Sequence, residues 1–194
     1  MSYPERYKTQ LLNAIESIDL NLVEDVIQTL KEARTSGHKI FVCGDGGTDF
    51  IASRFLCDMV QQASFNRASR FRILALNDQM PRGTQAEASN RVFVEQLKNF
   101  AEPGDVVIGI SVTGDSPNVV NAIDYACWIG CRTIAVTGKD GGKLAPLADL
   151  SIQVPVSHAA SIEDAHMIIC HMIGYYFVDF EKPLERLTDP PHPR

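Results

Sequence analysis

Apolar residues recur at two different spacings along this chain of 194 residues. From residue 5 to residue 34 they follow one another at steps of three and four, as Leu11, Ile15, Leu22 and Val26 do. This is the spacing of an amphipathic helix. The pattern predicts a single helix of about thirty residues, roughly 45 Å long at 1.5 Å per residue. We expect so long a helix to pack against its copies in an oligomer.

Beyond this segment, short apolar runs alternate with amphipathic ones. The runs predict strands at 38–43, 71–76, 105–111, 132–137 and 150–155. The amphipathic segments predict helices at 48–63, 87–101, 116–129 and 160–178, with a short helical turn at 142–148. Two of the strands, 106–110 and 133–136, are apolar on both faces, which is typical of a parallel sheet covered by helices on both sides. The alternation therefore predicts a doubly wound α/β fold.

Composition sets the number of domains. Apolar residues make up 45% of the chain, which suits one globular domain with a substantial core. We assign residues 1–182 to this domain, with 1–34 as its helical N-terminal segment. The tail from 183 to 194 carries four prolines, and we expect it to be extended or disordered.

Charge and cysteine content exclude several classes of protein. The net charge of −6 argues against a broad nucleic-acid surface, and no apolar run is long enough to span a membrane. We expect the short basic group Arg67–Arg72 to lie in a solvated loop. The five cysteines form no C-x-x-C pair, which indicates buried free thiols in a reducing compartment. We therefore expect a cytoplasmic protein that binds neither nucleic acid nor membrane.

Two glycine-containing turns carry the candidate chemistry. Gly44–Thr48 follows the apolar run 39–43, and Ser111–Ser116 follows the run 106–110. A strand that ends in small residues and opens a helix leaves backbone N–H groups free, at an end where the helix dipole favours an anion. Ser116 is expected to cap the next helix, with Pro117 as its first residue. The two turns together predict a small phosphorylated ligand at the carboxyl ends of parallel strands.

A larger set of segments carries a family resemblance. The segments Gly44–Thr48, Pro103–Ser111, Gly114–Val119, Thr137–Leu144 and Ile162–His166, with His171 after them, occur together and in this order. From about residue 8 to residue 178, the chain resembles the SIS (sugar isomerase) domain family, and within it most closely the sedoheptulose 7-phosphate (phosphoheptose) isomerases. The resemblance implies a five-stranded parallel sheet and a homotetramer with active sites between subunits. It also implies a phosphosugar aldose–ketose isomerase that works through an enediolate.

By position, the resemblance assigns individual roles. Asp58 would be the base and His171 the second proton-transfer residue, whereas His166 is interpreted as a core histidine. The hydroxyls of Thr48, Ser111, Thr113 and Ser116 would hold the phosphate. The full set of expected substrate-binding positions is Asp45, Gly46, Gly47, Thr48, Asp78, Ser111, Val112, Thr113, Ser116 and Glu163.

The chain departs from the family pattern at two positions that hold zinc in many members. A histidine is replaced by Arg54 and a glutamine by Glu163. Because arginine stays protonated and offers no lone pair, we expect no metal and no other cofactor. Arg54 and Glu163 could instead form an ion pair where the metal would sit. The alternative is an ordinary pair between Arg54 and Asp58, four residues apart on one helix.

Two functions remain open at this point. The retained Asp58 and His171 favour an isomerase. The altered metal positions favour a non-catalytic SIS module that binds a sugar phosphate and acts through protein partners, since the fold permits both. The segment 79–87 is shorter than its counterpart in the family, so the sequence does not identify which sugar phosphate is bound.

Overall fold

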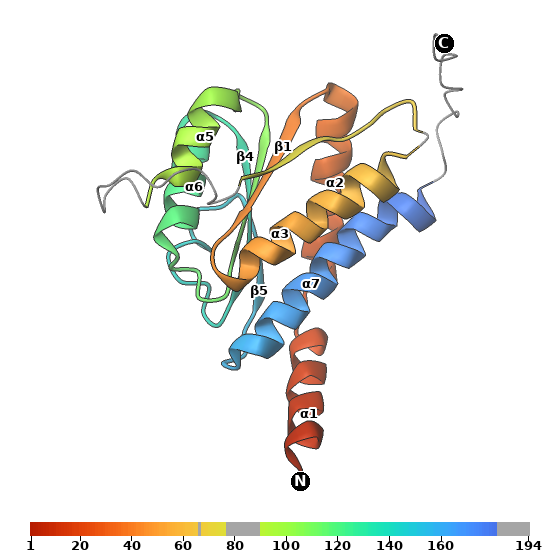
Figure 1. Cartoon of the computed structure of the whole chain (residues 1–194), viewed down its shortest axis with the longest axis vertical. Coiled ribbons are helices and arrows are strands. Elements are labelled where there is room, and N and C mark those ends of the chain that lie inside the picture. Colours follow the sequence, from red (N-terminus) through yellow and green to blue (C-terminus); the bar gives the residue numbers. More distant parts are fainter. Residues whose placement is uncertain (66, 77–89, 182–194) are drawn as a thin grey trace, which may run out of the picture.

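The computed structural model describes residues 1–65, 67–76 and 90–181, and its centre is a parallel sheet (Figure 1). The strands are β1 (Lys39–Gly44), β2 (Arg72–Leu76), β3 (Val106–Ser111), β4 (Arg132–Gly138) and β5 (Leu150–Val154). They lie in the order β2-β1-β3-β4-β5, and every neighbouring pair is parallel. The predicted doubly wound, five-stranded α/β fold is therefore confirmed, with strand bounds close to those expected.

Helices cover both faces of the sheet. One face packs against α2 (Leu20–Ser36), α3 (Gly47–Cys57) and α7 (Ala159–Tyr175), and the other against α5 (Val92–Phe100) and α6 (Pro117–Trp128). Short π-helical segments, η1 (Asp58–Ala63) and η2 (Tyr176–Phe180), follow α3 and α7. In Figure 1, α3 and α7 lie side by side across the front of the sheet.

The strands supply side chains to both layers of the core. In β1, Ile40 and Val42 join the apolar cluster under α2, α3 and α7, while Phe41 and Cys43 join the cluster under α5 and α6. All four side chains are fully buried. This alternation explains why the apolar run was continuous, because neither face of a central parallel strand meets water.

The predicted single helix over 5–34 is wrong. The chain forms α1 (Tyr3–Glu16) and then α2, with a break at residues 17–19. The Ser17 hydroxyl donates to the Ala14 carbonyl (2.7 Å), and the Asp19 carboxylate accepts from the Asn21 amide (2.9 Å) to start α2. These local hydrogen bonds stop the first helix and cap the second even though the apolar spacing continues.

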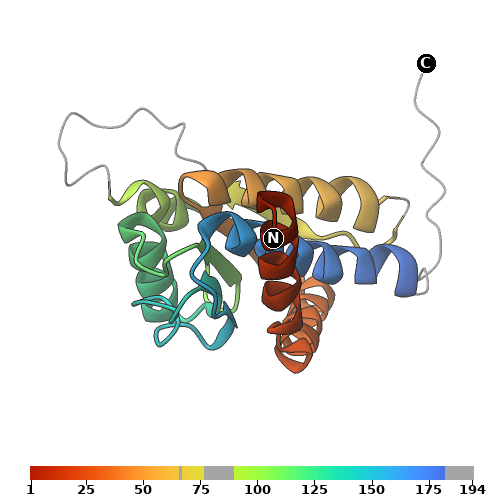
Figure 2. The same ribbon diagram turned by 90° about the horizontal axis from the view of Figure 1, so that it is seen from below.

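The first helix stands away from the sheet (Figures 1 and 2). It is anchored on α7, where the Tyr7 hydroxyl donates to Asp164 (2.6 Å) and the Tyr7 ring packs edge-on against His158. The hydrogen bond to the Asp164 carboxylate raises the pKa of Tyr7 to about 12. Of its own residues, only Ala14 is fully buried.

Three smaller predictions also need correction. Residues 142–147 form turns rather than a short helix, because Gly141 and Gly142 adopt positive φ and Pro146 has no amide hydrogen to donate. Cys127 is exposed, although Cys43, Cys131 and Cys170 are buried free thiols as expected. Arg67 is buried rather than solvated, and it donates to the carbonyl of Phe177.

Some predictions fall on residues outside the described ranges. Asp78, the segment 79–87 and the tail 183–194 belong to this group, so their expected roles stay predictions. The same holds for the start of the helix expected at 87, since α5 is described from Val92. In the described part of the chain, no helix combines the length and the apolar character needed to cross a membrane.

A buried carboxylate ties the amino ends of β1 and β3 together. Asp105 accepts from the backbone amides of Lys39 (2.7 Å) and Glu102 (2.9 Å), and the Lys39 ammonium lies 3.2 Å from its second oxygen. The Lys39 ammonium also bonds to the Glu102 carboxylate, which is the main reason why the pKa of Lys39 is raised. Asp105 is almost fully buried, so its charge depends on these donors.

We expect Asp105→Ala to lower the free energy of unfolding by about 3 kcal/mol, because it leaves two amides without their acceptor and removes one of the two carboxylates that Lys39 contacts. Asp124→Ala, an exposed aspartate on α6, is the matched control and should change it by less than about 0.5 kcal/mol. Urea denaturation of both variants measures the difference. Equal losses in the two variants would contradict this role for Asp105.

Candidate functional site

The strand order reverses between β1 and β3, and both glycine turns lie at this point. One turn joins β1 to α3 and the other joins β3 to α6. In a doubly wound sheet the crevice at such a reversal is the usual ligand site, because the two chains leave the sheet in opposite directions. The predicted pair of turns is therefore brought together by the topology.

The first turn is held by its own threonine. Gly46 adopts φ 61° and ψ −125°, a conformation that side chains disfavour. The Thr48 hydroxyl accepts from the Asp45 amide (2.8 Å) and lies 2.9 Å from both the Asp45 and the Ile110 carbonyl oxygens. Thr48 is almost fully buried, so in this structure its hydroxyl braces the turn against β3 instead of facing a ligand.

The second turn is more open. The Ser111 hydroxyl accepts from the Gly114 amide (3.0 Å), and the Thr113 hydroxyl accepts from the Asp115 amide (3.2 Å). Thr113 is exposed, and Val112 is half-buried beside it. Amides, small side chains and a following helix therefore converge here, which is the arrangement that suits a phosphate group.

A third loop supports the second turn, and its importance was not recognised from the sequence. After β4, the amide of Leu144 donates to the Gly114 carbonyl (2.9 Å), and that of Lys143 donates to the Asp115 carboxylate (3.2 Å). The backbones touch so closely that a Cβ atom at Gly114 would overlap the Gly141 carbonyl. The paired glycines Gly141 and Gly142 are the sequence signal for this close approach.

One side-chain hydrogen bond joins the two turns. Ser116 stands at the N-cap of α6 as predicted, but its hydroxyl makes no capping bond and donates instead to Asp45 Oδ2 (2.8 Å). Asp45 is half-buried, so this bond is partly shielded from water. It fixes the spacing between the β1 and β3 turns and thereby the width of the crevice.

The start of α3 is already next to a carboxylate of this chain. Glu163, from the first part of α7, lies directly against Gly47, at the place where a Cβ atom would be. A negative charge at a helix N-terminus is favourable, because the free amides and the dipole attract it. The first turn is therefore not the open anion-binding site that the sequence predicted. The second turn remains available to an anionic ligand.

The predicted proton-transfer residues meet farther along the same two helices. Asp58, at the end of α3, and His171, on α7, lie with Nε2 and Oδ2 3.6 Å apart. Arg54 Nε donates to Asp58 Oδ2 (3.1 Å), and Arg54 Nη2 lies 2.9 Å from Oδ1. The Asp58 side chain is only 2% exposed, compared with 43% for Arg54 and 41% for His171.

The hypothesis of an Arg54–Glu163 pair is wrong for this structure. Among the residues that the structure describes, no ion pair joins the two, and Arg54 pairs with Asp58. The reason is distance along the helix. Glu163 lies against Gly47, whereas Arg54 is seven residues later, about 10 Å along the axis. Asp58 is one turn away from Arg54, within ordinary i,i+4 reach.

The same geometry does not fit a metal ion. A guanidinium occupies both oxygens of Asp58, and a cation that cannot lose its proton would repel zinc at this place. Within the described ranges, no three His, Cys, Asp or Glu side chains gather in a metal-binding arrangement. Any chemistry at this cluster therefore comes from its own side chains.

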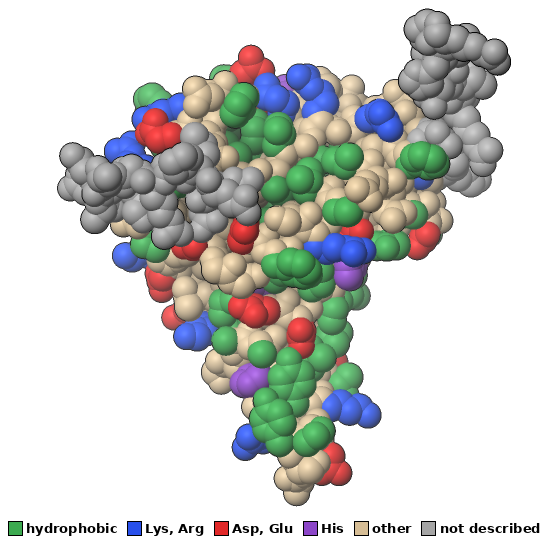
Figure 3. All heavy atoms as spheres, viewed as in Figure 1, with side chains coloured by type: hydrophobic (Ala, Val, Ile, Leu, Met, Phe, Trp, Pro, Cys, Tyr) green, Lys and Arg blue, Asp and Glu red, His purple; other side chains and the backbone are tan. Residues whose placement is uncertain are grey.

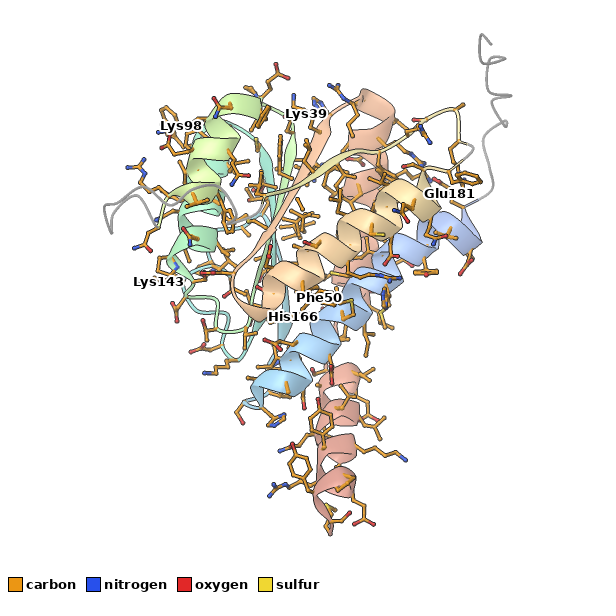
Figure 4. All side chains as sticks on the ribbon, viewed as in Figure 1. Lys39, Phe50, Lys98, Lys143, His166 and Glu181 are labelled. Atoms are coloured by element: carbon orange, nitrogen blue, oxygen red, sulfur yellow. The ribbon has the colours of Figure 1, made fainter. Side chains whose placement is uncertain are left out.

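His166 is buried among the residues between α7 and the sheet, as interpreted from the sequence (Figure 4). The Thr137 backbone approaches the ring, but within the described residues neither ring nitrogen makes a well-formed hydrogen bond. Burial lowers the pKa of His166 from 6.5 to about 4, so the ring is neutral in the folded protein at pH 7.

Comparison with known sequences finds one family. The profile of the SIS domain matches residues 5–138. A probable phosphoheptose isomerase from Thermoplasma volcanium is 36% identical over 82% of this chain and 83% of its own length. The phosphoheptose isomerase from Citrifermentans bemidjiense is 32% identical over 84% of this chain and 86% of its own.

Solved structures agree on the fold. The phosphoheptose isomerase from Neisseria gonorrhoeae superposes with a TM-score of 0.78 at 25% identity, covering 91% of this chain and 98% of its own. A phosphoheptose isomerase from Francisella tularensis reaches a TM-score of 0.81 at 21% identity, over 92% of this chain and 99% of its own. At 21% identity, the second likeness supports the fold alone.

Substitution of two glycines tests whether the close contact with the loop after β4 maintains the second turn. Gly114 and Gly37 have nearly the same φ, 72° and 73°, but a Cβ atom at Gly37 would meet open space. We expect Gly37→Ala to lower the free energy of unfolding by about 1 kcal/mol from backbone strain alone. Gly114→Ala should cost more and should also abolish thermal stabilisation by inorganic phosphate. If both variants kept that stabilisation, the second turn would not be the anion site.

The buried imidazole of His166 predicts a pH dependence of stability. Between pH 6.5 and pH 4 the unfolded chain binds a proton that the folded protein does not, so stability falls as the pH falls through this window. From pH 7 to pH 5 this residue should cost about 2 kcal/mol. In His166→Leu, the free energy of unfolding should fall by about 2 kcal/mol less between pH 7 and pH 5 than in the unaltered protein. Urea titrations at the two pH values measure this difference. Equal declines in both proteins would contradict the buried, neutral state.

Proposed function

Because the chain belongs to the SIS domain family, we propose that it is a phosphosugar aldose–ketose isomerase of the phosphoheptose isomerase type. The observation that carries the proposal is the convergence of Asp58 and His171, from two helices, in a chain that also has an open turn suited to phosphate. Eight relatives, at 29–36% identity, are named phosphoheptose isomerases or probable phosphoheptose isomerases. We take sedoheptulose 7-phosphate as the substrate to test first.

The phosphate binds at the second turn in this proposal. The amides of this turn that are not already bonded to Ser111 and Thr113 donate to its oxygens, together with the exposed Thr113 hydroxyl. The dipole of α6 favours its charge. The Glu163 carboxylate disfavours a second anion at the start of α3. The sugar phosphate is therefore directed to the turn after β3. Asp45, held by Ser116, faces the crevice where a sugar hydroxyl can donate to it.

The reaction moves one proton between neighbouring carbons through an enediolate. It needs a group that takes a proton from the carbon beside the carbonyl and returns it to the next carbon, and it needs donors for the negative oxygen. The Asp58–His171 pair supplies the first requirement. The half-exposed Arg54 guanidinium supplies positive charge for the second, so we propose an isomerase that works without a metal or other cofactor.

Distance along α3 supports a site shared between subunits. Asp58 follows Gly47 by eleven residues, about 16 Å along the helix axis. In an extended seven-carbon sugar, the ketone carbon lies seven bonds from phosphorus, about 9 Å in a zigzag chain. The hydrogen bond from Ser116 to Asp45 places the phosphate turn near the start of α3. One molecule is therefore too short to span this turn and the Asp58–His171 pair of the same chain. The turn of one copy and the pair of another can serve the same molecule.

Exposed apolar side chains provide a surface for such an assembly. On the projecting α1, Tyr3 and Leu12 are exposed, and Figure 3 shows hydrophobic atoms gathered along this helix. Phe50 on α3 is also exposed (Figure 4). We propose a homotetramer in the cytoplasm, in which these surfaces pack against other copies.

The alternative function, a non-catalytic module that acts through protein partners, is not favoured. The fold also occurs in a protein whose name is not that of an enzyme, the Vibrio vulnificus NanR protein complexed with ManNAc-6P, which superposes with a TM-score of 0.65. Its identity to this chain is only 11%, so the likeness concerns architecture alone. The relatives from Thermoplasma volcanium and Citrifermentans bemidjiense, at 36% and 32% identity, carry the name of an enzyme.

A turnover assay with sedoheptulose 7-phosphate tests the proposal. The unaltered protein should form the aldose phosphate, and His171→Ala should lower kcat about a thousandfold, because proton transfer by a positioned side chain contributes about 10²–10⁴. Thermal stabilisation by inorganic phosphate should persist in that variant. Background activity in the unaltered protein, with every sugar phosphate tried, would favour the binding module.

Mixing two inactive variants tests the shared site. Protein with Ser111→Ala and Ser116→Ala lacks the phosphate turn, and His171→Ala lacks the proton-transfer group. If sites lie between copies, unfolding and refolding the two together should restore about a quarter of the activity, from sites that carry neither change. Mixed protein as inactive as either parent would indicate that each site belongs to a single chain.

A further inference from the structure

The carboxylate of Asp58 is closed to a ligand. Its side chain is 2% exposed, Arg54 holds Oδ2 by a hydrogen bond and Oδ1 by an ion pair, and His171 lies over Oδ2. A general base must come within hydrogen-bond distance of the proton that it takes. No face of this carboxylate is left for a carbon-bound hydrogen of the sugar.

The His171 ring has the opposite character. It is 41% exposed, and only its Nε2 atom, which faces Asp58, is enclosed without a hydrogen-bond partner in the described chain. The edge that carries Nδ1 is therefore the open one. Tyr175, one turn later on α7, packs edge-on against the ring at 5.8 Å and helps to hold its plane.

We propose that His171 exchanges the proton with the sugar through Nδ1, and that Asp58 is a positioning residue that acts through the His171 ring. The inference rests on the proposed isomerase function and assigns the roles within it. Asp58 favours the tautomer with its proton on Nε2, which leaves the lone pair on Nδ1. Arg54 pairs with both oxygens of the buried carboxylate and fixes its orientation.

The step balances with these groups alone. Nδ1 takes the proton from C1 of the ketose, the C–H electron pair forms the C1–C2 double bond, and the carbonyl pair moves to the C2 oxygen. A proton passes from the C1 hydroxyl to the C2 oxygen, and the imidazolium returns its proton to C2 as the C1 carbonyl forms. Asp58 stabilises the imidazolium between the two transfers, and the sugar is neither oxidised nor reduced overall.

A double-mutant cycle separates the two roles. We compare kcat for Asp58→Asn, His171→Ala and the double variant. If Asp58 acts only through His171, Asp58→Asn lowers kcat in the unaltered protein but changes nothing in the His171→Ala background. If it lowers kcat by the same factor in both backgrounds, Asp58 takes the proton itself and the proposal is overturned.

Rescue by added imidazole distinguishes direct proton transfer by His171 from a purely structural role of this residue. Imidazole should restore part of kcat equally to His171→Ala and to the double variant, but not to Asp58→Asn. No rescue of His171→Ala would count against direct proton transfer by the ring. KM and stabilisation by inorganic phosphate should stay within about twofold in all three variants, since the phosphate turn is untouched.

A matched histidine provides the control. His38 is also 41% exposed and faces a buried aspartate, Asp105, at 3.8 Å, but this pair lies at the amino ends of the strands. His38→Ala should leave kcat unchanged and imidazole should not affect it. If the unaltered protein does not turn over the substrate, both the isomerase function and this inference are wrong. If it does, but the losses of kcat from Asp58→Asn and His171→Ala multiply in the double variant, this inference alone is wrong.

Discussion

A carboxylate removed from water must be matched by positive charge or by hydrogen-bond donors, and among the described residues Asp58 meets this requirement through Arg54 and His171. The three side chains therefore form one unit. Arg54 comes from one turn earlier on α3, and His171 from the parallel helix α7. Because the sheet holds these helices side by side, the position of His171 depends on the packing of the whole front layer.

The same packing places the Glu163 carboxylate and the phosphate of the proposed ligand at different turns. Glu163 enters from the first part of α7 and lies at the start of α3, so a negative charge of the protein already meets that helix end. The turn after β3 stays open, and the hydrogen bond from Ser116 to Asp45 fixes its distance from the first turn. The phosphate turn thus lies near the start of α3, and the proton-transfer residues Asp58 and His171 lie at its end.

The strands were predictable because their apolar runs report burial on both faces, as Ile40–Cys43 illustrates. The division of the N-terminal helix was missed although its signal was present, because Ser17 and Asp19 form cap bonds that a periodicity count ignores. The convergence of Asp58 and His171 was expected from the family resemblance and is seen in the structure. The place of Glu163 could not be read from spacing, since it depends on how α7 lies against α3.

The most direct measurement is a crystal structure of the protein soaked with sedoheptulose 7-phosphate. The account predicts the phosphate group on the amides of Ser111–Ser116, with C1 of the same sugar beside Nδ1 of His171 from another copy. A phosphate that displaces Glu163 at the start of α3, or a C1 atom in contact with an Asp58 oxygen, would contradict it.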